Sequence, residues 1–256
     1  MKYAFYITFL LFLIYMPAQA ATDEISLTSD TMQYDIEAGL FYAEGDVTIK
    51  ARDIVIMATL ASGHMNSRTF NLSGNITING TWNGDNVNLA AVSATVEIGD
   101  RPVYTLESGI SGTFGKIAID CDYLQMVGND ITAKNVRKFQ DQNAGITFSA
   151  ENIKGKIENG ELLQAEAEGR IVIKGTPGKS GDIVELKGKK AIYSIDRGTI
   201  VVSGGVSATQ NKRTLYADSL VYFPVTNRIE AIGKPRITVN VDDENLSSLS
   251  SPNEKK

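Results

Sequence analysis

The sequence predicts an all-β fold built of repeated two-strand units, and three observations support this prediction. A short motif recurs through the chain, and the strand after each copy alternates apolar and polar residues. Beyond residue 20, no stretch of helical length carries apolar residues at the period of an α-helix. Because stacked units of this kind bury a continuous apolar face, we expect a groove or tube rather than a catalytic pocket.

Residues 1–20 have the composition of a cleaved signal peptide. Lys2 supplies the positive start, residues 3–15 are almost all apolar, and residues 17–20 end in the small-x-small pattern that signal peptidase cuts. The alternative is a retained membrane anchor, but the apolar run is shorter than the roughly 20 residues that a spanning helix needs. No Cys follows the cut, which disfavours a lipoprotein anchor. Cleavage would leave Ala21 as the new terminus.

The repeated motif contains a small residue, a polar residue, a Tyr four positions after the polar one, and a Gly eleven positions after the Tyr. The full copies are Ser29-Asp30/Tyr34/Gly45, Gly188-Lys189/Tyr193/Gly204 and Ala217-Asp218/Tyr222/Gly233. Two further copies have Gly in place of Tyr, namely Ala58-Thr59/Gly63/Gly74 and Ala150-Glu151/Gly155/Gly169, the second with three additional residues. We expect each closing Gly to supply a backbone conformation or a close approach that a side chain would prevent.

The strands that follow the closing glycines alternate with period two, which is typical of half-buried strands. Residues 171–173 are instead apolar on both faces, and after Gly233 the alternation resumes only beyond Pro235. Residues 84–140 fit the motif poorly, although 87–96 and 116–126 still predict strands. The unbroken repeat favours one domain over residues 21–241, and the acidic, Ser/Asn-rich segment 242–256 predicts a disordered tail.

Charge and composition exclude several classes of function. The chain has 25 basic and 30 acidic residues, and a net charge of −5 disfavours nucleic acid as a partner. Cys121 is the only cysteine, so an intramolecular disulfide is impossible, and His64 is the only histidine, so neither a two-His zinc site nor a serine triad is expected. On a strand, Asp120 and Asp122 would share one face with Cys121 on the other, which favours an ordinary strand over a metal site. We therefore predict no catalytic residue, metal ligand or cofactor.

Two segments at opposite ends of the chain resemble the repeat unit of a known family. They are Leu215-Tyr216-Ala217-Asp218-Ser219-Leu220-Val221-Tyr222 continued by Glu230-Ala231-Ile232-Gly233-Lys234-Pro235-Arg236-Ile237, and Ser29-Asp30-Thr31-Met32-Gln33-Tyr34-Asp35 continued by Ala43-Glu44-Gly45-Asp46-Val47. Both resemble the OstA-like family, which includes LptA-like periplasmic lipopolysaccharide-transport bridge proteins. The family also includes an inner-membrane-tethered component and the soluble amino-terminal domain of the outer-membrane translocon.

The resemblance implies a twisted, slightly open β-jellyroll whose interior holds the lipid A acyl chains of lipopolysaccharide while the sugars project out. It also implies head-to-tail self-association in the periplasm, and edge-strand pairing with the inner-membrane transport complex and the outer-membrane translocon. The apolar strand faces suit acyl chains on their own account. The residues expected to face inward and bind lipid are Val47, Ile49, Ile76, Ile78, Ile171, Ile173, Val206, Leu220, Tyr222, Ile237 and Val239.

Plain core packing is the competing interpretation for each of these residues taken singly. Three other functions stay open from the sequence. The chain could be the tethered component of the same pathway, or a structural β-repeat surface protein with a dry core and no ligand. It could also be an exported carbohydrate-active enzyme, but such an enzyme usually needs clustered carboxylates on one sheet face, and no such cluster repeats at strand spacing here.

Overall fold

The structure of the protein is a computed structural model that describes residues 25–82, 84–175 and 183–239. The predicted signal peptide and the predicted polar tail lie outside the described residues. Every regular element in the described part of the chain is a β-strand. The part of the chain covered by the structure contains no helix with the length and apolarity that a membrane crossing requires.

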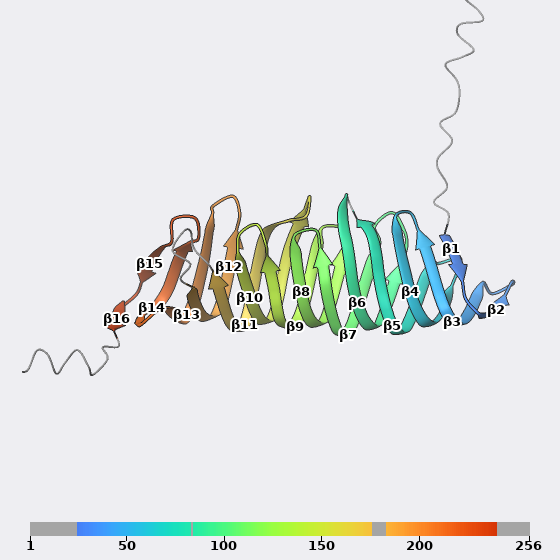
Figure 1. Ribbon diagram of the computed structural model, residues 1–256, viewed down its shortest axis with the longest axis horizontal. Helices are drawn as coiled ribbons and strands as arrows, with labels where there is room; N and C mark the ends of the chain where they lie inside the picture. Colours follow the sequence, from blue (N-terminus) through green and yellow to red (C-terminus); the bar gives the residue numbers. More distant parts are fainter. Residues whose placement is uncertain (1–24, 83, 176–182, 240–256) are drawn as a thin grey trace, which may run out of the picture.

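Sixteen strands follow one another along the long axis of the molecule (Figure 1). Their bounds are β1 Ile25–Thr28, β2 Thr31–Asp35, β3 Leu40–Ala51, β4 Ile54–His64, β5 Thr69–Trp82, β6 Asp85–Glu97, β7 Val103–Phe114, β8 Ile117–Val127, β9 Asp130–Asp141, β10 Ile146–Glu158, β11 Glu161–Gly175, β12 Val184–Ser194, β13 Thr199–Gln210, β14 Arg213–Phe223, β15 Arg228–Ile232 and β16 Arg236–Val239.

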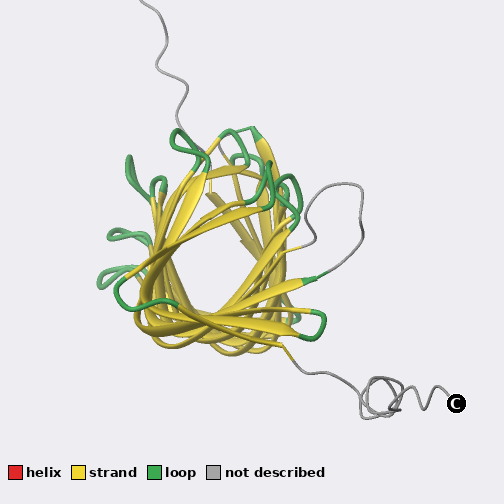
Figure 2. Cartoon of the chain, turned by 90° about the vertical axis from the view of Figure 1, so that its left-hand side faces the viewer, coloured by secondary structure: helices red, strands yellow, loops and turns green. Residues whose placement is uncertain are grey.

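The strands form a single antiparallel sheet in which each long strand pairs with the next along the chain. At one end β1 and β2 each pair with one half of β3, and at the other end β15 and β16 each pair with one half of β14. Seen along the long axis, the strands wrap around a common centre (Figure 2). The prediction of an all-β, twisted and slightly open jellyroll of two-strand units is confirmed.

Each long strand bends at a β-bulge near its middle, and the repeated motif marks this corner. In β5, Gly74 has a φ of +78°, and a Cβ on it would lie 2.8 Å from Oγ1 of Thr59. The Thr59 hydroxyl donates a 3.0 Å hydrogen bond to the Gly74 carbonyl. The polar residue of the motif lies against the closing Gly in the other copies as well, as Asp30/Gly45, Glu151/Gly169, Lys189/Gly204 and Asp218/Gly233. The expected close approach is therefore confirmed in all five copies.

Residues 84–140 match the motif poorly in sequence, but the structure builds them from the same two-strand units as the rest of the chain. That segment contains β6 to β9, and its bulges interrupt the pairing of β6 with β7, of β7 with β8 and of β8 with β9. The positive φ angles are carried here by Ser108 at 65°, Gly109 at 61° and Asn135 at 51°. Asn is among the side chains that tolerate this backbone region best. The units continue without interruption, but their corners are not built from the Gly of the motif.

The bend places the two halves of each strand on opposite sides of a shared apolar interior. Aromatic side chains from the opposite halves meet there. Trp82 at the end of β5 lies 4.5 Å from Tyr104 at the start of β7, and Phe148 at the start of β10 lies 6.1 Å from Tyr193 near the end of β12, both measured between ring centroids. The pair of Phe148 and Tyr193 is edge-to-face, a geometry that adds about 0.5–1.5 kcal/mol beyond the area it buries.

Candidate functional site

The interior is one apolar cluster that runs the length of the sheet. Nine of the predicted inward residues belong to it, and none of the nine is more than 2% exposed. They are Val47, Ile49, Ile76, Ile78, Ile171, Ile173, Val206, Leu220 and Tyr222. Their positions on β3, β5, β11, β13 and β14 bring them to a single face of the sheet. That they face inward agrees with the alternation in the sequence, whereas their contact with lipid stays a prediction.

Ile237 and Val239 differ from the other nine in their exposure, and their contact with lipid likewise stays a prediction. Ile237 is 66% exposed and Val239 is 53% exposed. Their cross-strand partners are Leu215 and Arg213 of β14, and Leu215 packs against the apolar cluster, so Ile237 lies on the inner face. It is exposed because β16 is the last strand, and among the described residues no further strand covers this end of the interior.

The opposite end of the sheet is open in the same way. Met32 and Tyr34 of β2 pair with the buried residues Ala43 and Phe41, so they lie on the inner face. They are nevertheless 44% and 50% exposed. The apolar inner face therefore ends at both edges of the sheet in side chains that water reaches.

A long seam runs where the turns at the two margins of the bent sheet approach each other. Near its middle the turn after β7 touches the turn after β10, because the backbone N–H of Lys116 donates to the carbonyl of Gly160 at 3.4 Å. Lys116 Nζ lies 3.7 Å from Glu161 Oε1, which also accepts a 2.9 Å hydrogen bond from Nδ2 of Asn143. The seam is bridged at this crossing by one backbone hydrogen bond, one ion pair and one amide contact.

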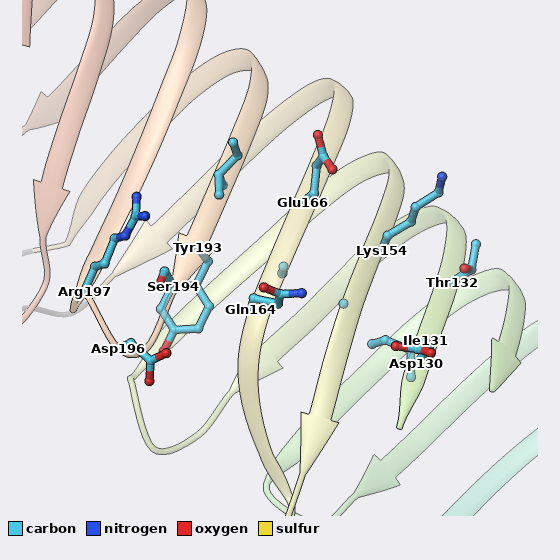
Figure 3. Close-up of a pocket in the computed structure, with 13 residues that line it drawn as sticks. Asp130, Ile131, Thr132, Lys154, Gln164, Glu166, Tyr193, Ser194, Asp196 and Arg197 are labelled. Atoms are coloured by element: carbon cyan, nitrogen blue, oxygen red, sulfur yellow. The ribbon is translucent and has the colours of Figure 1, made fainter. Parts of the chain in front are cut away.

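A hollow of about 640 Å³ lies over β9 to β12 (Figure 3). The polar and charged residues lining it are Asp130, Thr132, Lys154, Gln164, Glu166, Ser194, Asp196 and Arg197. A hydrogen bond from Lys190 holds the pKa of Glu166 below its usual value, and Glu166 in turn raises the pKa of Lys190. Glu166 and Lys190 therefore form an ion pair rather than an isolated acid and an isolated base.

The Asp120-Cys121-Asp122 segment of β8 has the arrangement that the strand interpretation predicts. Cys121 is fully buried, and burial raises the pKa of its thiol to about 12. Both aspartates instead face Arg137 of β9. Oδ1 of Asp120 lies 2.6 Å from Nη2 of Arg137, and Oδ1 of Asp122 lies 2.5 Å from Nη1. The hydrogen bond from Arg137 lowers the pKa of Asp122. Within the described residues, no group of three or more His, Cys, Asp and Glu side chains is placed to hold a metal ion.

The seam contacts were not predicted from the sequence. Lys116 and Glu161 lie 45 positions apart, and their approach depends on how far one margin of the sheet is displaced along the other. No local pattern reports that displacement. The sequence shows only that residues 144–146, at the turn after β9, and residue 195, at the turn after β12, have no charged or polar side chain.

The chain has matches among solved structures alone. No protein-family description and no curated protein sequence matches the chain. Among solved structures, the chain is similar to the crystal structure of LptH from Pseudomonas aeruginosa, the LptA homologous periplasmic component of the conserved lipopolysaccharide transport device. The alignment has 11% sequence identity and a TM-score of 0.25, and it covers 86% of this chain and 96% of LptH. Values this low carry no argument about ligand or activity.

Proposed function

We propose that the chain is a lipopolysaccharide-binding transport protein whose interior shields lipid A acyl chains while the sugars stay outside. The observation that carries this proposal is the continuous apolar inner face, which ends at both edges of the sheet in exposed apolar side chains. An elongated apolar interior suits acyl chains because each buried CH₂ contributes about 0.8 kcal/mol. Binding, not catalysis, is the role that such an interior supports.

The proposed location is the periplasm. Residues 1–20 would be removed as a signal peptide, residues 21–241 would form the lipid-binding jellyroll, and residues 242–256 would remain a polar tail. This division rests on the composition of the two ends of the chain. A protein that moves lipid between two membranes must work in the aqueous space between them. The acyl chains would be exposed to water there unless an apolar interior shielded them.

Head-to-tail self-association is part of the proposal, because β1 and β2 form one edge of the described sheet, β15 and β16 form the other, and edge strands present backbone groups for pairing. The side-chain charges at the two ends of the sheet are complementary. Residues 25–53 contain six acidic and two basic residues, and residues 211–239 contain five basic and two acidic residues. A second copy placed against β15 and β16 through its β1 and β2 would continue the antiparallel order and cover the exposed inner-face residues Tyr34 and Ile237. The same edges would pair with the inner-membrane transport complex and the outer-membrane translocon.

The test is photo-crosslinking in cells to lipopolysaccharide. A photoreactive residue replaces Ile49, Ile78, Ile173 or Leu220 in the interior, with the outward residue Lys50 as the control. Because a bulky group in a packed core can prevent folding, a second pair uses the exposed end of the sheet, with Ile237 against its neighbour Thr238 on the other face. We expect lipid adducts at the inner-face positions alone. A folded protein with no adduct at any inner-face position would refute the proposal.

Two alternatives have distinct outcomes in simple experiments. For the membrane-tethered component of the same pathway, the first twenty residues would be retained, whereas amino-terminal sequencing of the exported protein should begin at Ala21 if they are cleaved. For a ligand-free structural β-repeat surface protein, the folded chain would capture no acyl chain at Ile237 or at the interior positions.

A further inference from the structure

A cavity of about 560 Å³ opens at the seam beside the crossing of Lys116 and Gly160. It lies where the turn after β9 faces the turns after β12 and β14. This size falls within the roughly 300–1,000 Å³ that small-molecule sites occupy. The cavity therefore has room for a ligand and opens between the margins of the sheet, and one of its lining turns joins β14 to the end strand β15.

Apolar side chains line this cavity from solvent to core. Val225 is 88% exposed and Ile195 is 36% exposed, and they lie on the surface side of the lining. Ile146 is 1% exposed and Tyr193 is 4% exposed, and both belong to the apolar cluster of the interior. The apolar part of the lining thus runs from the surface to the interior, and the buried carboxylate of Asp141, the cross-strand partner of Ile146, lies beside it. An exposed apolar residue that leads into a buried apolar floor fits a hydrocarbon chain.

The charged groups around the cavity already have partners in the protein. Lys116 pairs with Glu161, and Glu161 accepts from Asn143. The carboxylate of Asp141 accepts hydrogen bonds from the backbone N–H groups of Asn143 and Ala144, at 2.9 and 3.1 Å. Burial, reinforced by the charges of Asp141 and Glu161, raises the pKa of Tyr193 to about 12, so its hydroxyl stays neutral. Among the described residues, the lining therefore offers no unpaired charge to a phosphate or carboxylate headgroup, and the part of a ligand that it recognises is the hydrocarbon.

The packed interior makes a route through the seam useful. Residues on its inner face are covered by one another along most of the length. An acyl chain that entered only at β1 and β2, or at β15 and β16, would have to displace these contacts one after another. Beside the cavity, by contrast, the margins are joined at the Lys116 crossing by contacts that lie at the protein surface, with 57% of the Lys116 side chain and 43% of the Glu161 side chain exposed. Exposed ion pairs of this kind contribute about 0–1 kcal/mol, so the pair of Lys116 and Glu161 adds little to the backbone hydrogen bond and the amide contact that also join the margins there.

We infer that the seam cavity is a side entrance through which an acyl chain passes from the surface to the interior. The inference rests on the proposed function, because it presumes that the interior holds acyl chains. It adds that loading does not depend on the ends of the sheet. A copy whose ends are covered by neighbours would still exchange lipid through its seam.

The test blocks the mouth of the cavity without altering the core. Val225→Cys is modified with a bulky maleimide, and Val92→Cys, on the outer face of β6 and 56% exposed, receives the same reagent as the matched control. The native Cys121 is buried and should not react in the folded protein. Uptake of a pyrene-labelled long-chain acyl ester is then followed by stopped-flow fluorescence. We expect modified Val225→Cys to take up the probe about tenfold more slowly than modified Val92→Cys, with the same amount bound at equilibrium.

The outcomes separate the two proposals. Equal uptake rates for the two modified variants, with both binding the probe, would overturn the side entrance and leave the proposed function intact. Absence of binding by the unmodified, folded protein would overturn the proposed function and the side entrance together. Since position 225 is exposed in a turn, Val225→Cys should fold, and Val225→Asp provides a second variant that puts an uncompensated charge at the mouth and should also slow uptake.

Discussion

Two adjacent glycines at the corner of β13 allow backbone strain and steric contact to be measured separately. Gly204 and Gly205 have φ angles of +92° and +73°. A Cβ on Gly204 would lie 2.8 Å from Cβ of Lys189, whereas a Cβ on Gly205 would have no heavy atom within 4 Å. Gly205→Ala therefore introduces backbone strain alone, and Gly204→Ala introduces strain together with a close contact.

The expected losses differ for this reason. A left-handed backbone costs a residue with a Cβ roughly 1–2 kcal/mol. The contact at Gly204 adds about 1–3 kcal/mol, typical of overpacking, because Cβ of Lys189 is fixed to the backbone and cannot rotate away. We expect the free energy of unfolding to fall by about 1–2 kcal/mol for Gly205→Ala and by about 2–5 kcal/mol for Gly204→Ala.

Urea unfolding followed by far-ultraviolet circular dichroism measures both losses. Gly99→Ala is the control, because a Cβ there meets no heavy atom within 4 Å and the backbone is not left-handed, so its midpoint should not fall and should rise slightly as alanine restricts the unfolded chain. In the Gly204→Ala background, Lys189→Gly should restore the steric part and Lys189→Ala should not, since alanine keeps the Cβ. Equal losses for Gly204→Ala and Gly205→Ala would refute the claim that the motif holds two chain segments in close contact.

Four further predictions follow from buried and paired groups. Leu220→Ala, at a side chain with no exposed surface, should lower the free energy of unfolding by about 2–5 kcal/mol in the same urea experiment. The Cys121 thiol, with its pKa raised to about 12, should resist iodoacetamide at pH 8 in the folded protein and react after denaturation; rapid labelling of the native state would contradict its burial. Arg137 lowers the pKa of Asp122, so the stabilisation from this pair is present above the ordinary carboxyl pKa and is lost as the pH falls through the lowered value; in Arg137→Gln, a carboxyl titration by NMR should show a higher pKa for Asp122 than in the unmodified protein. Arg236→Glu reverses a charge on the basic edge and should weaken self-association in sedimentation velocity at low salt, whereas Lys154→Glu on the outer face of β10 should not.

The sequence was sufficient to predict the strands wherever the inner face alternates. Ile76 and Ile78 on β5, and Val47 and Ile49 on β3, lie on the buried face because a pleated strand sends every second side chain to the same side. The spacing of Thr59 and Gly74 likewise reflects a direct contact, which is why the motif survives where its Tyr does not. At these positions the residue types and their spacing are enough to predict which side chains are buried or in contact.

Prediction failed where the decisive geometry is not local. The corners of β7 and β9 use Ser108 and Asn135 at positive φ, so a search for Gly missed two units of the repeat. The alternation places Ile237 on the inner face, as the structure does, but alternation does not determine how exposed an inner-face residue of an edge strand is. The approach of Lys116 to Glu161 depends on the displacement of one sheet margin along the other, which accumulates over several strand pairs.

The two-strand unit with its corner bulge also governs how such a molecule can change in size. Each unit contacts only the units before and after it, apart from the turns that meet across the seam. Insertion or loss of a whole unit would lengthen or shorten the interior while preserving both ends, their opposite charges and the bend of every strand. The reach of the molecule would therefore be adjustable in steps of one hairpin, whereas a single added strand would reverse the direction of every strand beyond it and move each later turn to the opposite margin.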